Sequence, residues 1–320
     1  MNIIGSLLLF VGLFYFLDFG QIGEGFARIS QESVVWASLL AAVALIIASI
    51  RWWLFVWAAR FPHGFWVSVR VRLIAQLFNL LIPSGVVGDG LQVFLVSRRP
   101  RLSGPLALAT ILTDRLVALF SVMLVLIMTA WLLQDDMSGV VYGTLISGSI
   151  GVAIFVLAAL ASQKLRLLKQ ATGRLGKIIR FGLETVRAIN SFRNVLQTLL
   201  LAFVFASVGI LVNTAIGWVL ISGMADVTYV QLIPTFCLVM LSAFVPATFS
   251  GMGVREWILY ANLKDYGLSL EESVAISLAL FGILICVAAA LSAIVNSVSI
   301  YRGDTTSWAK TLFSGKRSEP

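Results

Sequence analysis

The residues that could do chemistry gather at two glycine-containing breaks in an otherwise apolar chain of 320 residues. Glycine lets free backbone N–H groups approach a ligand, and the start of a helix favours anionic groups such as phosphate. Arginine binds phosphate through paired charge-assisted hydrogen bonds. The sequence therefore predicts a site for a phosphate-bearing group. Its candidate residues, which include an Asp-Arg pair at the start of a later apolar run, are Asn79, Ser84, Asp89, Asp114, Arg115, Ser250, Gly251, Gly253, Arg255 and Glu256.

Other kinds of chemistry find little support in the chain. His63 is the single histidine, and Cys237 and Cys286 both lie in apolar runs, so we expect no metal site, no disulfide and no serine-histidine-acid triad. The stretch that begins at Gly251 starts like a dinucleotide fingerprint, but Glu256 stands where a third glycine is needed and no βαβ pattern surrounds it. We therefore expect no catalytic residue, no cofactor and no enzymatic activity.

The composition shows which elements must position these residues. Hydrophobic residues make up 59% of the chain, charged residues 12%, and the mean hydropathy is +0.98, which excludes a water-soluble globular protein. A membrane-spanning helix needs about 20 apolar residues. The sequence predicts an all-α polytopic membrane protein, with a single membrane domain over residues 1–302 and a short polar tail over 303–320. Its six predicted spans are residues 3–19, 34–50, 106–133, 140–161, 195–221 and 274–300.

Two further apolar stretches, residues 65–96 and 229–260, are broken by proline and glycine. Irregular backbone at membrane depth persists only where protein or water satisfies its polar groups. We therefore predict that each stretch is a re-entrant hairpin of two short helices. Hairpins that enter from opposite sides are typical of an inverted repeat, in which the substrate site lies near the midplane.

The distribution of basic residues predicts the orientation in the membrane. With the N-terminus in the cytoplasm, nineteen of the 23 basic residues fall in cytoplasmic segments, including Arg51, Arg70 and Arg72. Both termini are then cytoplasmic and the protein lies in the cell inner membrane. The same topology explains the formal net charge of +8, so we expect no nucleic-acid partner. Residues 163–193 predict a basic amphipathic segment on the inner surface that anionic lipids hold in part, and a plain linker is the alternative.

The charged candidates allow two interpretations. A charge near the bilayer centre is costly, so it is paired or lines a polar cavity. Arg255 and Glu256 either contact a headgroup, or neutralise one another and cap a helix. Asp114 and Arg115 either complete a cluster with Asp89, Arg255 and Glu256, or form an interfacial pair that contributes little energy.

These motifs together resemble the lysylphosphatidylglycerol synthase transmembrane region. The matching stretches are Arg51-Trp52, residues 79–89, Asp114-Arg115, residues 246–256 and residues 266–275. The resemblance covers residues 1–302 and implies a flippase-like membrane protein. Relatives often show an arginine shortly after the acidic residue of the first break, whereas Asp89 here is followed by Gly90, Leu91 and Gln92. Members with a fused aminoacyltransferase domain make the aminoacylated lipid, and we do not expect that activity here.

The leading hypothesis is an inner-membrane translocator of a phospholipid, a modified lipid or a polyprenyl-linked glycolipid. In this hypothesis Arg255 contacts phosphate, and Asp89 and Glu256 balance charge or meet a cationic headgroup. The expected partners are membrane lipids, mainly anionic ones. The second hypothesis is a non-transporting accessory subunit that scaffolds enzymes of envelope-lipid or glycolipid biosynthesis.

Overall fold

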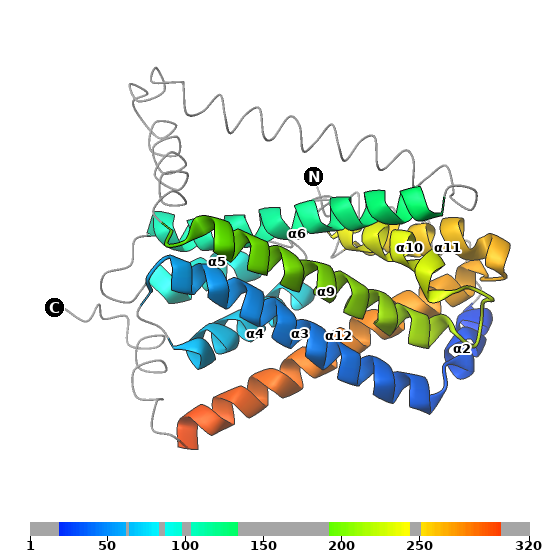
Figure 1. Ribbon diagram of the computed structural model, residues 1–320. Coiled ribbons are helices and arrows are strands. Elements are labelled where there is room, and N and C mark those ends of the chain that lie inside the picture. The colour runs from blue at the N-terminus through cyan, green and yellow to red at the C-terminus, as the bar shows by residue number, and fades with distance from the viewer. Residues whose placement is uncertain are drawn as a thin grey trace, which may run out of the picture.

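The computed structural model describes residues 19–61, 64–82, 87–97, 104–133, 192–243 and 251–301, and all regular elements in these ranges are helices (Figure 1). The helices are α2 (Phe19–Arg28), α3 (Gln31–Ala58), α4 (Phe65–Leu81), α5 (Val87–Ser97), α6 (Gly104–Leu132), α9 (Val195–Ile221), α10 (Tyr229–Ser242), α11 (Val254–Leu263), the 3-10 helix η2 (Lys264–Tyr266) and α12 (Leu270–Tyr301).

Four of these helices, α3, α6, α9 and α12, are long and apolar enough to cross a membrane. They match the predicted spans at 34–50, 106–133, 195–221 and 274–300. The predicted span at 140–161 and almost all of that at 3–19 lie outside the described residues. The structure therefore shows an all-helical polytopic membrane protein, while the total of six spans stays a prediction.

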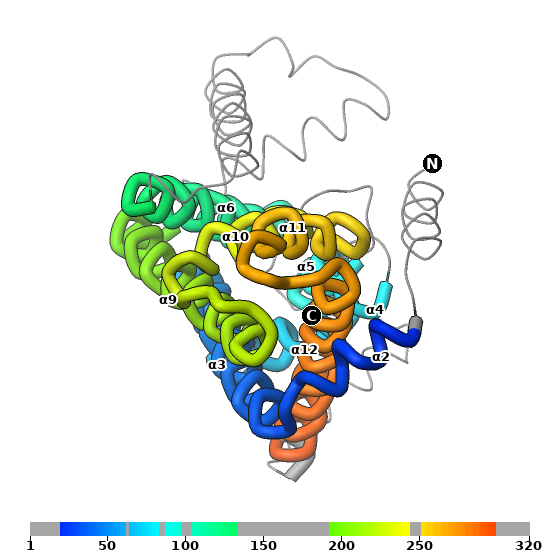
Figure 2. The backbone as a smooth tube through the Cα atoms, turned by 90° about the vertical axis from the view of Figure 1, so that its right-hand side faces the viewer, coloured from blue at the N-terminus to red at the C-terminus, as the bar shows by residue number. Residues whose placement is uncertain are grey.

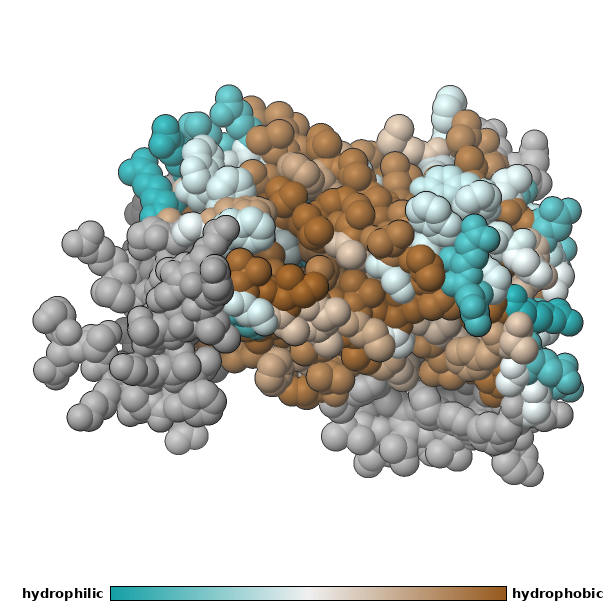
Figure 3. Space-filling model, turned by 90° about the horizontal axis from the view of Figure 1, so that it is seen from below, coloured by the Kyte–Doolittle hydropathy of each residue, from teal (hydrophilic) through white to brown (hydrophobic). Residues whose placement is uncertain are grey.

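The surface of these helices is apolar where a soluble protein would be polar. Large exposed side chains include Trp36 and Leu39 on α3, Trp131 on α6, and Leu196 and Leu200 on α9. Viewed from below, hydrophobic residues cover the middle of the molecule and hydrophilic ones gather toward its two ends (Figure 3). This arrangement suits helices whose outer faces meet lipid and whose ends meet water.

The short helices form two hairpins, and each hairpin begins and ends at the same end of the molecule, opposite to that of the other hairpin. α3 and α12 run in one direction, and α6 and α9 run in the other (Figure 1). The first hairpin, α4 with α5, connects the end of α3 to the start of α6 at one end. The second hairpin, α10 with α11, connects α9 to α12 at the other end. The predicted helix pairs at 65–96 and 229–260 are thus present.

The packing of the second half repeats that of the first (Figure 2). α3 packs against α4, α6 and α12, and α9 packs against α10, α12 and α6. The hairpin helix α4 contacts α5 and α12, while α10 contacts α11 and α6. Likewise α5 contacts α6, and α11 contacts α12. The two central helices α3 and α9 pack against each other. Each of these contacts therefore has a counterpart in the other half, whereas the contact of α2 with α12 has none among the described residues.

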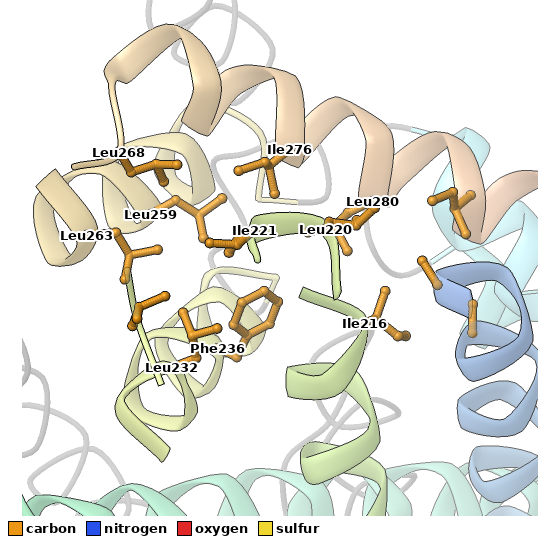
Figure 4. Close-up of a cluster of buried hydrophobic side chains, with 14 of the residues drawn as sticks. Ile216, Leu220, Ile221, Leu232, Phe236, Leu259, Leu263, Leu268, Ile276 and Leu280 are labelled. Atoms are coloured by element: carbon orange, nitrogen blue, oxygen red, sulfur yellow. The ribbon is translucent and has the colours of Figure 1, made fainter. Parts of the chain in front are cut away.

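A buried apolar cluster joins the second hairpin to the long helices (Figure 4). Gly217 on α9 allows the closest approach, because a Cβ atom at this position would lie 1.6 Å from Cζ of Phe236 on α10. Labelled members of the cluster are Ile216, Leu220, Ile221, Leu232, Phe236, Leu259, Leu263, Leu268, Ile276 and Leu280.

Local capping fixes the start of α12 and the position of α2. The Ser269 N–H donates to Glu272 Oε2 at 2.9 Å and the Glu272 N–H donates to Ser269 Oγ at 3.1 Å, which is a reciprocal capping box. Arg28, at the end of α2, donates to Glu272 Oε1. Helix α2 was not among the predicted elements. It packs across the beginning of α12, and its residue Ile22 is buried there.

Candidate functional site

A short polar network closes the tip of the first hairpin. Asn79, in the last turn of α4, donates to Asp89 Oδ1 at 3.0 Å and accepts from the Gly88 N–H at 2.7 Å. A Cβ atom on Gly88 would lie 1.9 Å from the carbonyl oxygen of Ala75, so only glycine fits between the two helices. The side chain of Asn79 thus ties the end of α4 to the first turn of α5.

Asp89 is held in turn by Arg115 of α6. Arg115 donates from Nε to Asp89 Oδ2 at 3.0 Å and from Nη2 to Oδ1 at 2.8 Å. The Arg115 side chain is 32% exposed and that of Asp89 is 17% exposed. This two-point ion pair is therefore an accessible part of the polar cluster around the first hairpin.

Behind that pair lies a fully buried carboxylate shared by two arginines. Arg51 of α3 donates to Asp114 from Nε at 2.7 Å and from Nη2 at 3.1 Å. Arg72 of α4 places Nη2 3.3 Å from Oδ2 of the same carboxylate. Arg72 also donates from Nη1 to Gln92 Oε1 at 3.5 Å, and the amide nitrogen of Gln92 is buried without a hydrogen-bond partner among the described residues. Arg51 is therefore tightly held, whereas the contacts of Arg72 are long.

These two groups form one cluster because Asp89 and Gln92 are three residues apart on α5 and so share a face of the helix. We call the set the arginine cluster. Among the described residues its three arginines face two aspartates, which gives the cluster one surplus positive charge. A buried surplus charge is costly at membrane depth unless another anion approaches it. The members of the arginine cluster are Arg51, Arg72, Asn79, Asp89, Gln92, Asp114 and Arg115.

The tip of the second hairpin depends on backbone that favours glycine. Gly251 and Gly253 have φ angles of +84° and +87°, a region that other residues rarely adopt. A Cβ atom on Gly251 would lie 2.5 Å from the Ser242 hydroxyl oxygen. The Gly253 N–H donates to Glu256 Oε2 at 2.6 Å, so the Glu256 carboxylate caps the start of α11.

Arg255 and Glu256 are buried and turned toward α12. Arg255 donates from Nε to Ser277 Oγ at 2.5 Å and from Nη2 to the Ser277 carbonyl oxygen at 3.0 Å. The Ser277 hydroxyl donates to Glu256 Oε1, and the guanidinium lies 5.9 Å from the centre of the Phe281 ring. These contacts match the interpretation in which the pair neutralises itself and caps a helix. The predicted contact between Arg255 and phosphate stays a prediction, and it would require these bonds to break.

The structure divides the five charged residues that the sequence grouped together. Asp89, Asp114 and Arg115 belong to the arginine cluster, and within it Asp114 and Arg115 choose different partners. Arg255 and Glu256 form a separate pair, and no ion pair among the described residues joins the two sets. Ser84 and Ser250 lie outside the described residues.

Four participants were not predicted as site residues: Arg51, Arg72, Gln92 and Ser277. Arg51, Arg70 and Arg72 were predicted to lie in cytoplasmic segments, and their side of the membrane stays a prediction. They lie within α3 and α4, and the side chains of Arg70 and Arg72 are buried. The signal that could have found Arg72 and Gln92 is their position inside apolar helices, where a polar residue needs a partner.

The arginine cluster offers donors for an anion rather than ligands for a metal. Among the described residues, no group of three or more histidine, cysteine, aspartate or glutamate side chains could hold a metal ion. Arginine and amide N–H groups instead suit oxygen atoms of phosphate or carboxylate groups.

Comparison with known proteins then gives the family. No curated protein matches the chain. The sequence does match the family model of the lysylphosphatidylglycerol synthase TM region over residues 3–292, which is nearly the whole chain. The resemblance predicted from the breaks and the Asp-Arg pair is confirmed, and the four long apolar helices agree with it. The chain therefore belongs to the lysylphosphatidylglycerol synthase TM region family and is a multi-pass membrane protein of lipid metabolism.

Proposed function

We propose that the protein is a translocator of a lipid with a phosphate-bearing headgroup, and not an enzyme. The headgroup passes the arginine cluster while the lipid tails stay in the bilayer. The observation that carries this proposal is the surplus positive charge of the cluster, which lies between the hairpin helices α4 and α5 and the long helices α3 and α6. A phospholipid, a modified lipid and a polyprenyl-linked glycolipid all carry the required phosphate.

The exposed pair at the tip of the first hairpin is where the headgroup first meets the protein. Arg115 is one-third exposed, so its remaining donors can reach a phosphate without the loss of a buried contact. Arg255 is less suited to this first contact, because it is buried and donates from Nε and Nη2 to Ser277. Asp89 competes with the phosphate for Arg115, which lets the headgroup leave again.

Repeated packing supports a transport mechanism. The contacts that α3, α4 and α5 make with the long helices have counterparts in those of α9, α10 and α11, and the two hairpins leave from opposite ends of the molecule. We interpret this as an inverted repeat in which both hairpins are re-entrant. Such repeats support alternating access, because one half can rock against the other around a central site.

The orientation that goes with this mechanism places both termini and the start of α4 in the cytoplasm of the cell. Cysteine labelling in a background without Cys237 and Cys286 tests it. Gly64→Cys, at the exposed start of α4, should react only after the membrane is made permeable, whereas Asp226→Cys, at the opposite end, should react in intact cells. The reverse pattern would contradict the orientation.

Reconstitution into vesicles tests transport directly. The wild-type protein should speed the movement of a labelled anionic phospholipid between leaflets, and the variant Arg115→Gln with Asp89→Asn should abolish that acceleration. The double change removes one charge of each sign and leaves the net charge of the cluster unchanged, so the protein should still fold. The matched control, Arg28→Gln with Glu272→Gln, removes an ion pair at the end of the molecule and should transport normally.

Two outcomes would overturn the proposal. Wild-type transport by a well-folded Arg115→Gln, Asp89→Asn variant would remove the exposed pair from the route. No acceleration by the wild-type protein, with any anionic lipid, would instead favour the non-transporting accessory subunit.

A further inference from the structure

The buried part of the arginine cluster contains a donor that no described residue accepts. The amide nitrogen of Gln92 is buried and has no hydrogen-bond partner among the described residues, and the Gln92 side chain has no exposed surface. A buried donor without an acceptor destabilises a protein, because it has lost its hydrogen bonds to water and gained none in return. Its neighbour Arg72 makes only long contacts, 3.3 Å to Asp114 and 3.5 Å to Gln92. The Gln92 amide therefore lacks an acceptor, and its neighbour Arg72 holds its two acceptors only at long distances.

The balance of charges around Asp114 also indicates that Arg72 lacks a full counter-charge. Asp114 is the shared partner of Arg51 and Arg72, and Arg51 occupies both of its oxygens at 2.7 and 3.1 Å. Arg72 therefore supplies the surplus charge of the cluster. A single anionic group next to Arg72 would balance it and could also accept from the Gln92 amide.

We propose that Arg72 and Gln92 form an inner subsite for a single phosphate-class anion, reached from the exposed Asp89–Arg115 pair. Gln92 follows Asp89 by three residues on α5, about 4.5 Å further along the helix axis. An anion that leaves Arg115 needs to advance by only one helical turn. Because Arg72 lies on α4 and Gln92 on α5, separation of the two hairpin arms opens the subsite.

This subsite deepens the proposed function, from which it takes a membrane lipid as the source of the anion. A phosphodiester headgroup carries one negative charge and matches the surplus of one. Free phosphate has the same chemistry, so an experiment must separate the two sources. Binding without transport can be measured on the purified protein, so failure of this inference is distinguishable from failure of translocation.

The test measures the unfolding midpoint of the full-length protein in micelles with phosphatidylglycerol, phosphatidylcholine or inorganic phosphate. Ligands that bind the folded state raise this midpoint. Phosphatidylglycerol should raise it by a few degrees over phosphatidylcholine. An equal rise with inorganic phosphate alone would overturn the assignment of a lipid source.

Gln92→Glu is the decisive variant because it places a carboxylate beside Arg72. The internal anion should raise the midpoint of the lipid-free protein and abolish the added effect of phosphatidylglycerol. Gln31→Glu, an exposed change of the same charge in the first turn of α3, should leave that effect intact. A full phosphatidylglycerol effect in Gln92→Glu would overturn the subsite.

Two other results would also count against the subsite. A Gln92→Glu protein that fails to fold contradicts it, because the added carboxylate should relieve a surplus charge rather than create one. Gln92→Met keeps the shape and the surplus charge but removes the unused amide donor. This variant should show a smaller phosphatidylglycerol effect than the wild type, and an unchanged effect would show that the amide takes no part.

Discussion

Asp114 should be far more important for folding than Arg72, one of the two arginines that it binds. The carboxylate is fully buried and is the anion shared by Arg51 and Arg72. Asp114→Asn leaves two neighbouring cations and no carboxylate between them. Arg72→Gln instead leaves Arg51 and Asp114 as a neutral pair with its hydrogen bonds intact. The two substitutions each remove one charge, yet the first raises the local net charge and the second cancels it.

The structure sets the expected magnitudes. Removing one partner of a buried ion pair costs about 3–5 kcal/mol, because the other charge stays buried without compensation. For Asp114→Asn two cations are left, so we expect a loss at the upper part of that range. Arg72→Gln gives up only contacts of 3.3 and 3.5 Å, and we expect a loss below about 1.5 kcal/mol. The difference follows from the ratio of two arginines to one aspartate around Asp114, and not merely from the fact that both residues belong to the arginine cluster.

Equilibrium unfolding in mixed micelles checks the prediction. The ratio of folded to unfolded protein should fall about 1,000-fold or more for Asp114→Asn and about tenfold or less for Arg72→Gln. Asp226→Asn, an exposed aspartate at the end of the molecule, is the control and should unfold like the wild type. Equal losses for Asp114→Asn and Arg72→Gln would refute the reasoning, because they would show that the surplus charge has no energetic weight.

Three further predictions concern the hairpins. Gly217→Ala should lose about 1–3 kcal/mol in the same unfolding assay, because its Cβ overlaps the ring of Phe236, and Phe236→Leu in the same chain should recover part of the loss. Gly88→Ala should lower both abundance and transport, since the added Cβ would force α5 away from α4; normal abundance would contradict the close approach. Arg255→Gln with Glu256→Gln should be more abundant in membranes than either single variant, as measured by blotting, because no lone buried charge remains.

The long helices could be predicted from the sequence because hydropathy alone defines them. A run of about 20 apolar residues has few alternatives to a membrane-spanning helix. The two broken pairs were also predictable, since Pro83 and Pro246 interrupt apolar runs that are otherwise helical. The amphipathic α2 was missed because its ten residues are too short and too polar to register as a span.

Members of the site could be predicted, but their partners could not. A charged residue in an apolar run needs an opposite charge or a polar cavity, and this requirement identified Asp89, Asp114 and Arg115 as site residues. Which residue supplies the compensation depends on how helices far apart in sequence cross. Arg51 and Asp114 are 63 residues apart, and Arg255 and Ser277 are 22 apart. No local pattern contains such distances, so Gln92 and Ser277 looked like ordinary polar residues within helices.

The two hairpins share a pattern in sequence but differ in electrostatics, and this difference indicates a division of roles. Each places an acidic residue at the third position of its second helix, Asp89 in α5 and Glu256 in α11. Glu256 is neutralised by its neighbour Arg255, and Ser277 completes their bonds within the protein. Asp89 belongs instead to a cluster with one charge left over and one donor unused. Among the described residues, the uncompensated charge therefore lies at the first hairpin, whereas the charged pair of the second hairpin is neutral, and this asymmetry is why we propose that an anionic headgroup binds at the first hairpin.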